Sequence, residues 1–351
     1  MLKTIGKQLQ IRAEEIFIKR RLIHKKLNST VNFSKALEEV KRILVIPSNA
    51  YGGILNAAVI VKKLKDRYPH SEVRISVPND WASVVEKFPG VDATIGDWNA
   101  DSVWSDRYNS QIKAVSDWGV DLLVRLGSHM SVKVNYGCVI SGAKLRLCHI
   151  SEDLTSPFWN ITLEKTLTGL SDFAVGTALL EAIGIENSFL SPSRLGVFKH
   201  FYRNDYKSQE SITVALDAEN LLNCLGRDKF NDTVDILQKD NYKIVIVMGL
   251  ARSATVSYVI KRFGAKASIH SSTDMLSVGS VLARCNVAIC ANGELLHWAN
   301  AVGTPTMCLQ SVRNESVKTT LEEEGIYVIS PESLNFSQMS DLVKKTISIS
   351  D

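Results

Sequence analysis

The segment from Val287 to Leu309 constrains the fold more than any other part of the sequence. It consists of a short apolar run, a polar loop, a helical stretch, a Gly303-Thr-Pro305 turn and a second apolar run. The apolar runs are typical of buried β-strands, and the glycine and proline are typical of a helix end. A strand that leads into a helix N-terminus presents unpaired backbone N–H groups and the positive end of the helix dipole, which favour a bound phosphate. The alternative is a β-α-β unit whose loop binds no ligand.

Length and composition predict a soluble protein of two domains. The chain has 351 residues, of which 45% are hydrophobic and 22% charged, and no apolar run approaches the ~18 residues that a membrane-spanning helix needs. The cysteines are scattered without a Cys-x-x-Cys pair, at Cys138, Cys148, Cys224, Cys285, Cys290 and Cys308. They are typical of reduced core thiols in a cytoplasmic protein, and no histidine spacing beside them indicates a metal site.

The positive charge is concentrated in residues 1–38. This segment holds nine Lys/Arg against three Glu, a net +6, whereas the whole chain carries +4 and its body is therefore slightly acidic. An acidic body argues against nucleic-acid binding. Apolar residues recur three or four apart along the segment, as one face of a helix requires: Leu2, Ile5, Leu9, Ala13, Ile16, Ile23 and Leu27. We expect a basic amphipathic helix that docks on an anionic membrane surface, or that packs on the body or on a protein partner.

The residues after this segment alternate between strand and helix patterns. A strand at Arg42–Ile46, a loop at residues 47–53 with two glycines, a helix from Ile54 to Arg67 and a strand at Val73–Val77 form a β-α-β unit with parallel strands. A second series begins with the strand Ile212–Leu216. It continues with helices near residues 227–239, 254–263 and 275–284, and with a strand at 243–248.

Two Rossmann-like halves joined by a linker explain this pattern. We expect an N-terminal domain at residues 39–195, a linker within 192–210, a C-terminal domain at residues 205–335 and a last helix in 336–351. Two such halves would face a cleft with the carboxyl ends of their strands.

Several motifs resemble glycosyltransferase family 9, the ADP-heptose:lipopolysaccharide heptosyltransferases. The most specific is His297-x-Ala299-x-Ala301-x-Gly303-Thr-Pro, which is similar to the family's His-x-Ala-x-Ala-x-Gly-Thr-Pro. The helix end Leu64-Lys-Asp-Arg-Tyr-Pro69 and the turn Ser141-Gly-Ala-Lys144 also resemble family elements.

The resemblance implies an α/β GT-B fold of two facing Rossmann-like domains, here with an extra N-terminal helix. It further implies a metal-independent inverting glycosyltransferase that moves a sugar from a nucleotide donor, ADP-linked in the family, to a glycolipid or glycan acceptor. Such an enzyme would work in the cytoplasm or on the inner face of the membrane, in lipopolysaccharide biosynthesis. No metal or other cofactor is expected.

The candidate site residues follow from the strand ends and from the resemblance. For the nucleotide sugar they are Gly249, Arg252, Asn292, Gly293, Glu294 and His297, and for the acceptor loop Ser48, Asn49, Gly52 and Gly53. Arg252 can donate a forked pair of hydrogen bonds to phosphate. An inverting transfer needs a base near the acceptor hydroxyl, for which Asp217 and Glu219 are the candidates, with Glu294 as a third.

Three positions depart from the family pattern. Gly53 replaces the family's aspartate, Asn292-Gly293-Glu294-Leu295 replaces Asp-Thr/Ser-Gly-Pro, and Asn223-Cys-Leu-Gly226 replaces Lys-x-Trp-Pro. They leave an alternative, an inactive GT-B protein that serves as a binding or scaffold subunit and docks through its N-terminal helix. A Rossmann oxidoreductase is disfavoured, because no strand is followed by Gly-x-Gly-x-x-Gly with an acid about 20 residues on.

Overall fold

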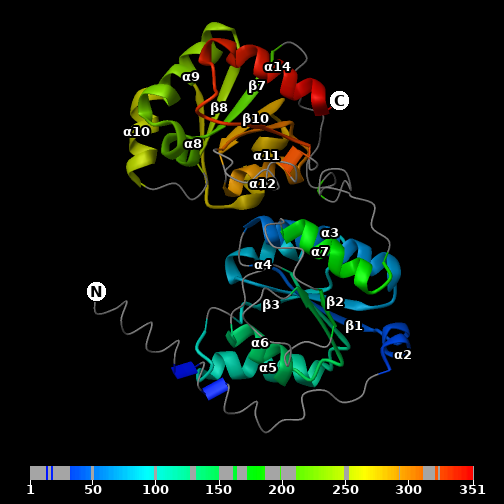
Figure 1. Cartoon of the computed structure of the whole chain (residues 1–351). Coiled ribbons are helices and arrows are strands. Elements are labelled where there is room, and N and C mark those ends of the chain that lie inside the picture. The colour runs from blue at the N-terminus through cyan, green and yellow to red at the C-terminus, as the bar shows by residue number, and fades with distance from the viewer. Residues whose placement is uncertain are drawn as a thin grey trace. The chain divides into compact units, whose positions relative to one another are not determined.

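In a computed structural model the chain divides into two compact units, Met1–Ser188 and Phe189–Asp351. The structure describes residues 13–14, 17–18, 32–48, 51–98, 101–126, 132–149, 161–163, 172–185, 198, 211–248, 253–291, 293–310, 321–322 and 325–350. Each unit contains one six-stranded sheet, and all the strand pairs among these residues are parallel (Figure 1).

The first unit has the strand order β3-β2-β1-β4-β5-β6. The strands are β1 (Arg42–Ile46), β2 (Glu72–Val77), β3 (Ala93–Gly96), β4 (Leu122–Arg125), β5 (Leu145–His149) and β6 (Ile161–Leu163). The helices are α2 (Phe33–Glu38), α3 (Tyr51–Arg67), α4 (Asn79–Val85), α5 (Asp106–Trp118), α6 (Val132–Ile140) and α7 (Asp172–Ala182). Helices α3 and α7 lie on one face of the sheet and α5 and α6 on the other (Figure 1).

Burial on both faces explains why these strands are nearly continuous apolar runs. In β1 every residue except Arg42 is buried, as in parallel sheets covered by helices on both sides. Helix α5 begins where the Ser105 hydroxyl accepts a hydrogen bond from the Tyr108 N–H at 3.1 Å, and ends at Gly119 in the left-handed region at φ 75°. Its buried face contributes Tyr108 and Ile112 to the core.

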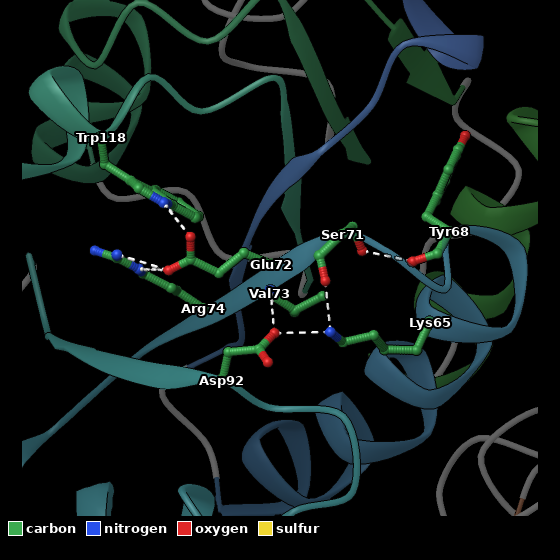
Figure 2. A network of polar contacts seen from close by, with 8 residues as sticks. All are labelled: Lys65, Tyr68, Ser71, Glu72, Val73, Arg74, Asp92 and Trp118. Carbon is green, nitrogen blue, oxygen red and sulfur yellow. Dashed lines mark hydrogen bonds and ion pairs between the residues drawn. The ribbon is translucent and has the colours of Figure 1, made fainter.

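A polar network fixes the end of α3 to the amino ends of β2 and β3 (Figure 2). The Lys65 ammonium pairs with Asp92 at 2.8 Å, and the same carboxylate accepts the Val73 N–H at 2.7 Å. Beside them Glu72 accepts the Trp118 indole N–H at 2.8 Å. Because these contacts lie at the amino edge of the sheet, the family-like Leu-Lys-x-x-Tyr-Pro helix end has a structural role here.

Three described residues of the N-terminal segment pack on the first unit. Glu14 accepts a hydrogen bond from the Ser102 hydroxyl at 2.6 Å, Ile18 is 0% exposed, and the Phe17 ring meets Trp104 at 5.8 Å. Ala13, which belongs to the predicted stripe, is exposed. The prediction of one helix over residues 1–38 is also wrong at its end, because extended Asn32 caps the separate helix α2.

The second unit repeats the topology of the first, with the order β12-β11-β10-β7-β8-β9. The strands are β7 (Thr213–Asp217), β8 (Lys243–Met248), β9 (Ser268–Ser271), β10 (Val287–Ala291), β11 (Thr306–Leu309) and β12 (Ile326–Ile329). The helices are α8 (Ala218–Leu225), α9 (Arg227–Lys239), α10 (Ser253–Phe263), α11 (Met275–Ala283), α12 (Glu294–Ala301), the 3-10 helix η4 (Phe336–Gln338) and α14 (Met339–Ser350).

Helices α8, α9, α10 and α14 pack into one core with the second sheet. Phe230 and Phe263 meet edge to face in it, and Met339 and Val343 bring the last helix into the same core. Phe198, in the middle of the predicted linker, is fully buried, with its ring 5.9 Å from that of Trp298. Packing of the second unit therefore begins before residue 205.

Two local predictions need correction. Gly52 and Gly53 lie in the first turn of α3, not in a loop, because the apolar face that starts at Ile54 outweighs the low helix propensity of glycine. Asn223-Cys-Leu-Gly226 is the end of helix α8, which the sequence reading missed, with Gly226 at φ 80°.

Candidate functional site

The strand order of the second unit reverses between β7 and β10, and the predicted donor residues follow these two strands. Leu216 lies opposite Ile289 in the register, so Asp217 at the end of β7 and Ala291 at the end of β10 share one edge of the sheet. In open α/β sheets ligands bind outside the carboxyl ends of the strands at such a switch point. Helices α8 and α12 both begin there.

Asp217 is the N-cap of α8 and is only 2% exposed. Its Oδ1 accepts the Asn220 backbone N–H at 3.3 Å, and its Oδ2 accepts the Asn220 side-chain amide at 2.8 Å. Burial raises the pKa of Asp217 to about 6, the two hydrogen bonds oppose that rise, and the nearby Glu219 adds to it. Both carboxylate oxygens are thus engaged in capping, whereas Glu219 in the first turn of α8 is partly exposed.

Gly293 lies where β10 leads into α12, directly against Asn220. A Cβ at this position would overlap the Asn220 side-chain nitrogen and would lie 2.9 Å from its Cγ. A side chain at this position would therefore have to displace the Asn220 amide from its hydrogen bond to Asp217. The N-termini of α8 and α12 are therefore in contact at Gly293. Because glycine has no side chain, the backbone there stays open to a ligand.

Glu294 is the first residue of α12 and places an acidic side chain at the N-terminus of that helix. Its Oε1 atom is buried and accepts no hydrogen bond from the described residues. Burial, and then the negative charge of Asp217, raise the pKa of Glu294 to about 7. Two carboxyl groups with raised pKa values therefore lie close together at a helix N-terminus that would favour an anion.

The motif from His297 to Pro305 holds α12 in place against the sheet. Ala299 and Ala301 are buried in α12, which packs on α11 and on β10. Gly303 ends the helix at φ 76°, and the Thr304 hydroxyl donates to the Leu282 carbonyl of α11 at 2.8 Å. His297 lies one turn into α12 and is partly buried.

The buried cysteines near the site are poor nucleophiles. Cys290 and Cys308 are opposite each other on β10 and β11. Burial raises the pKa of Cys308 to about 12 and that of Cys290 well above its ordinary value. Redox and nucleophilic roles are thus disfavoured at this edge.

Several predicted residues lie outside the described residues: Gly249, Arg252, Asn292 and Asn49. In the first unit, Ser48 follows β1 at the carboxyl edge, while Gly52 and Gly53 belong to α3. Two residues that the sequence reading missed occupy the switch point between β1 and β4 of that unit. Arg125 ends β4, is 5% exposed and donates a hydrogen bond to the buried Asn135 of α6.

Within the part of the chain that the structure describes, no three His, Cys, Asp or Glu side chains group as metal ligands. None of the described helices is long and apolar enough to cross a membrane.

Two parallel α/β units, each with Rossmann strand order and a switch point at its carboxyl edge, define the GT-B class of fold. No family model matches the chain. Lipopolysaccharide heptosyltransferase 3 of Escherichia coli K12 is 23% identical over 292 residues, which cover 74% of this chain and 79% of that protein.

Solved structures agree with this sequence match. The glycosyl transferase family 9 protein of Veillonella parvula superposes with a TM-score of 0.68 at 15% identity, covering 88% of this chain and 97% of the other. The E. coli heptosyltransferase WaaC with ADP gives 0.63 at 11% identity, covering 88% and 99%. Together these likenesses confirm the GT-B fold and the resemblance to glycosyltransferase family 9.

Proposed function

We propose that this protein is a glycosyltransferase that takes a sugar from a nucleotide-diphosphate donor and transfers it to a glycolipid or glycan acceptor. The observation that carries the proposal is the carboxyl edge of the second sheet, where β7 and β10 bring the N-termini of α8 and α12 together at the switch point. The heptosyltransferase name of the sequence relative and the ADP in the structure of WaaC support the same donor class.

In this proposal the second unit binds the donor diphosphate. Backbone N–H groups at Gly293 and in the first turn of α12 face the phosphates, because a helix N-terminus offers unpaired donors and a positive dipole end. Arg252 follows β8, which pairs with β7, and donates to a phosphate oxygen. The acceptor binds at the corresponding edge of the first unit, where Ser48 follows β1.

The transfer itself is an inverting displacement. A base removes the proton of the acceptor hydroxyl, the acceptor oxygen bonds to the anomeric carbon, and the bond to the diphosphate oxygen breaks to release the nucleoside diphosphate. Since both oxygens of Asp217 are engaged in capping α8, we assign the base to Glu219, and we assign to Asp217 the positioning of α8.

The test is release of nucleoside diphosphate from a panel of ADP-, UDP- and GDP-sugars, together with calorimetric binding of the same compounds. Arg252→Ala should weaken donor binding at least tenfold. The matched control is Arg262→Ala, because Arg262 lies on the surface of α10 and pairs with Asp235 at 3.5 Å. Absence of binding to every compound at millimolar concentration would overturn the proposal and leave the scaffold alternative.

A further inference from the structure

Glu294 lies where the proposed function needs a negatively charged ligand. It is the first residue of α12, follows the glycine that leaves the backbone open, and has a buried Oε1 that accepts no hydrogen bond from the part of the chain that the structure describes. When ionised, its carboxylate would place a negative charge beside the incoming diphosphate. When protonated, it becomes neutral and gains an O–H donor.

The titratable groups around Glu294 further disfavour its ionised form. Among the described residues of the elements packed around it, the titratable side chains are Asp217 of β7, Glu219 and Cys224 of α8, Cys290 of β10, Cys308 of β11 and His297 of α12 itself. Asp274 and Arg284 flank the neighbouring helix α11. Of these groups the Asp217 carboxylate acts on Glu294, and it raises the pKa of Glu294 further above its ordinary value. A second carboxylate held by Asn220 therefore makes ionisation of Glu294 unfavourable even before a ligand arrives.

We propose that the nucleotide-diphosphate donor binds only to the form of the protein in which Glu294 carries a proton, so that binding takes up one proton and Glu294 gates the donor site by pH. The inference rests on the proposed function, since it concerns regulation of the same site. The protonated carboxyl group donates its hydrogen to a phosphate oxygen. The proton comes from solvent and returns to it when the nucleoside diphosphate leaves.

The consequence is a defined pH dependence. Glu294 has a pKa of about 7, so the binding-competent form dominates below pH 7 and falls about tenfold for each further pH unit. ADP-glucose is a suitable probe because both of its phosphates are esterified and its charge stays constant over this range. Its dissociation constant should be roughly thirtyfold higher at pH 8.5 than at pH 5.5.

Calorimetric titration of the full chain with ADP-glucose at pH 5.5, 7.0 and 8.5 tests the gate. At pH 8.5 the measured heat in two buffers of different ionisation enthalpy should reveal uptake of about one proton per ADP-glucose bound. Glu294→Gln keeps the size and the hydrogen-bond donor without the charge. Its affinity should therefore change much less between pH 5.5 and pH 8.5 than that of the wild-type protein, and the change that is left comes from Asp217, which still ionises in this range. The matched control is Asp228→Asn, an exposed acid in the first turn of α9, which should retain the wild-type pH dependence.

The possible results distinguish a failure of the pH gate from a failure of the proposed glycosyltransferase function. If the wild-type protein binds ADP-glucose with the same affinity at pH 5.5 and 8.5 and takes up no proton, the gate is overturned and the proposed function stands. If neither the wild-type protein nor Glu294→Gln binds any of the ADP-, UDP- and GDP-sugars of the panel at any pH, both are overturned. Because the proton uptake is measured on the wild-type protein, the gate stays testable even if the variant fails to fold.

Discussion

Replacing Asp217 by asparagine tests whether burial makes the ionised form of this carboxyl group unfavourable in the folded protein. The ordinary pKa of this carboxyl group is 3.8 and burial raises it to about 6 in the folded protein. Such a group favours the folded state fully below pH 3.8, and this contribution is lost as the pH rises through 6. The difference between these two pKa values lowers the unfolding free energy by about 3 kcal/mol at pH 8. Of this loss, about 2 kcal/mol develops between pH 4.5 and pH 8.

Asp217→Asn removes the ionisation and keeps a side chain that can cap α8. The unfolding free energy of the variant minus that of the wild-type protein should therefore increase by about 2 kcal/mol from pH 4.5 to pH 8. Urea denaturation followed by circular dichroism measures this difference, and hydrogen exchange of β7 and β10 peptides localises it to the second unit.

The matched control is Asp274→Asn, which replaces the cap of α11 at an exposed position. It reports the effect of exchanging a cap carboxylate for an amide without burial. A difference between Asp217→Asn and wild type that is constant from pH 4.5 to pH 8 would refute the reasoning, because it would mean that Asp217 ionises as readily in the folded chain as in the unfolded one.

Three further changes have defined outcomes. Thr304→Val leaves the Leu282 carbonyl without its 2.8 Å partner and should lower the unfolding free energy by about 1–3 kcal/mol in urea titrations, while the exposed Thr273→Val should not. Gly293→Ala must displace the Asn220 side chain and should weaken ADP-glucose binding at least tenfold in calorimetry. Unchanged affinity would contradict the role of this contact in donor binding. Glu219→Gln should lower kcat about a hundredfold with an unchanged donor KM in the release assay, and an unaltered kcat would exclude Glu219 as the base.

The sequence predicts the framework of the second unit well because its elements are bounded by strong local signals. The expected helix at residues 227–239 and strand at 243–248 coincide with α9 and β8. Apolar runs without alternation indicate strands covered on both faces, and glycines such as Gly303 mark the helix ends.

What the sequence misses depends on contacts between distant residues. Helical periodicity selects a stripe through Ala13, yet Glu14 is buried because Ser102, 88 residues away, donates to it. Helix α8 follows β7 without a loop. The sequence leaves Asp217 as a candidate base, a solvated loop acid or a helix cap, and its capping role depends on the contact with Asn220. The raised pKa of Glu294 likewise depends on Asp217, which is brought near only when β7 pairs with β10.

The most direct test of the donor site is hydrogen exchange of the whole chain with and without ADP-glucose at pH 6. The proposed function predicts slower exchange in peptides that cover the β7–α8 and β10–α12 junctions, because the bound diphosphate would accept hydrogen bonds from their backbone N–H groups. Unchanged exchange at both junctions with ADP-glucose at saturation would contradict the account.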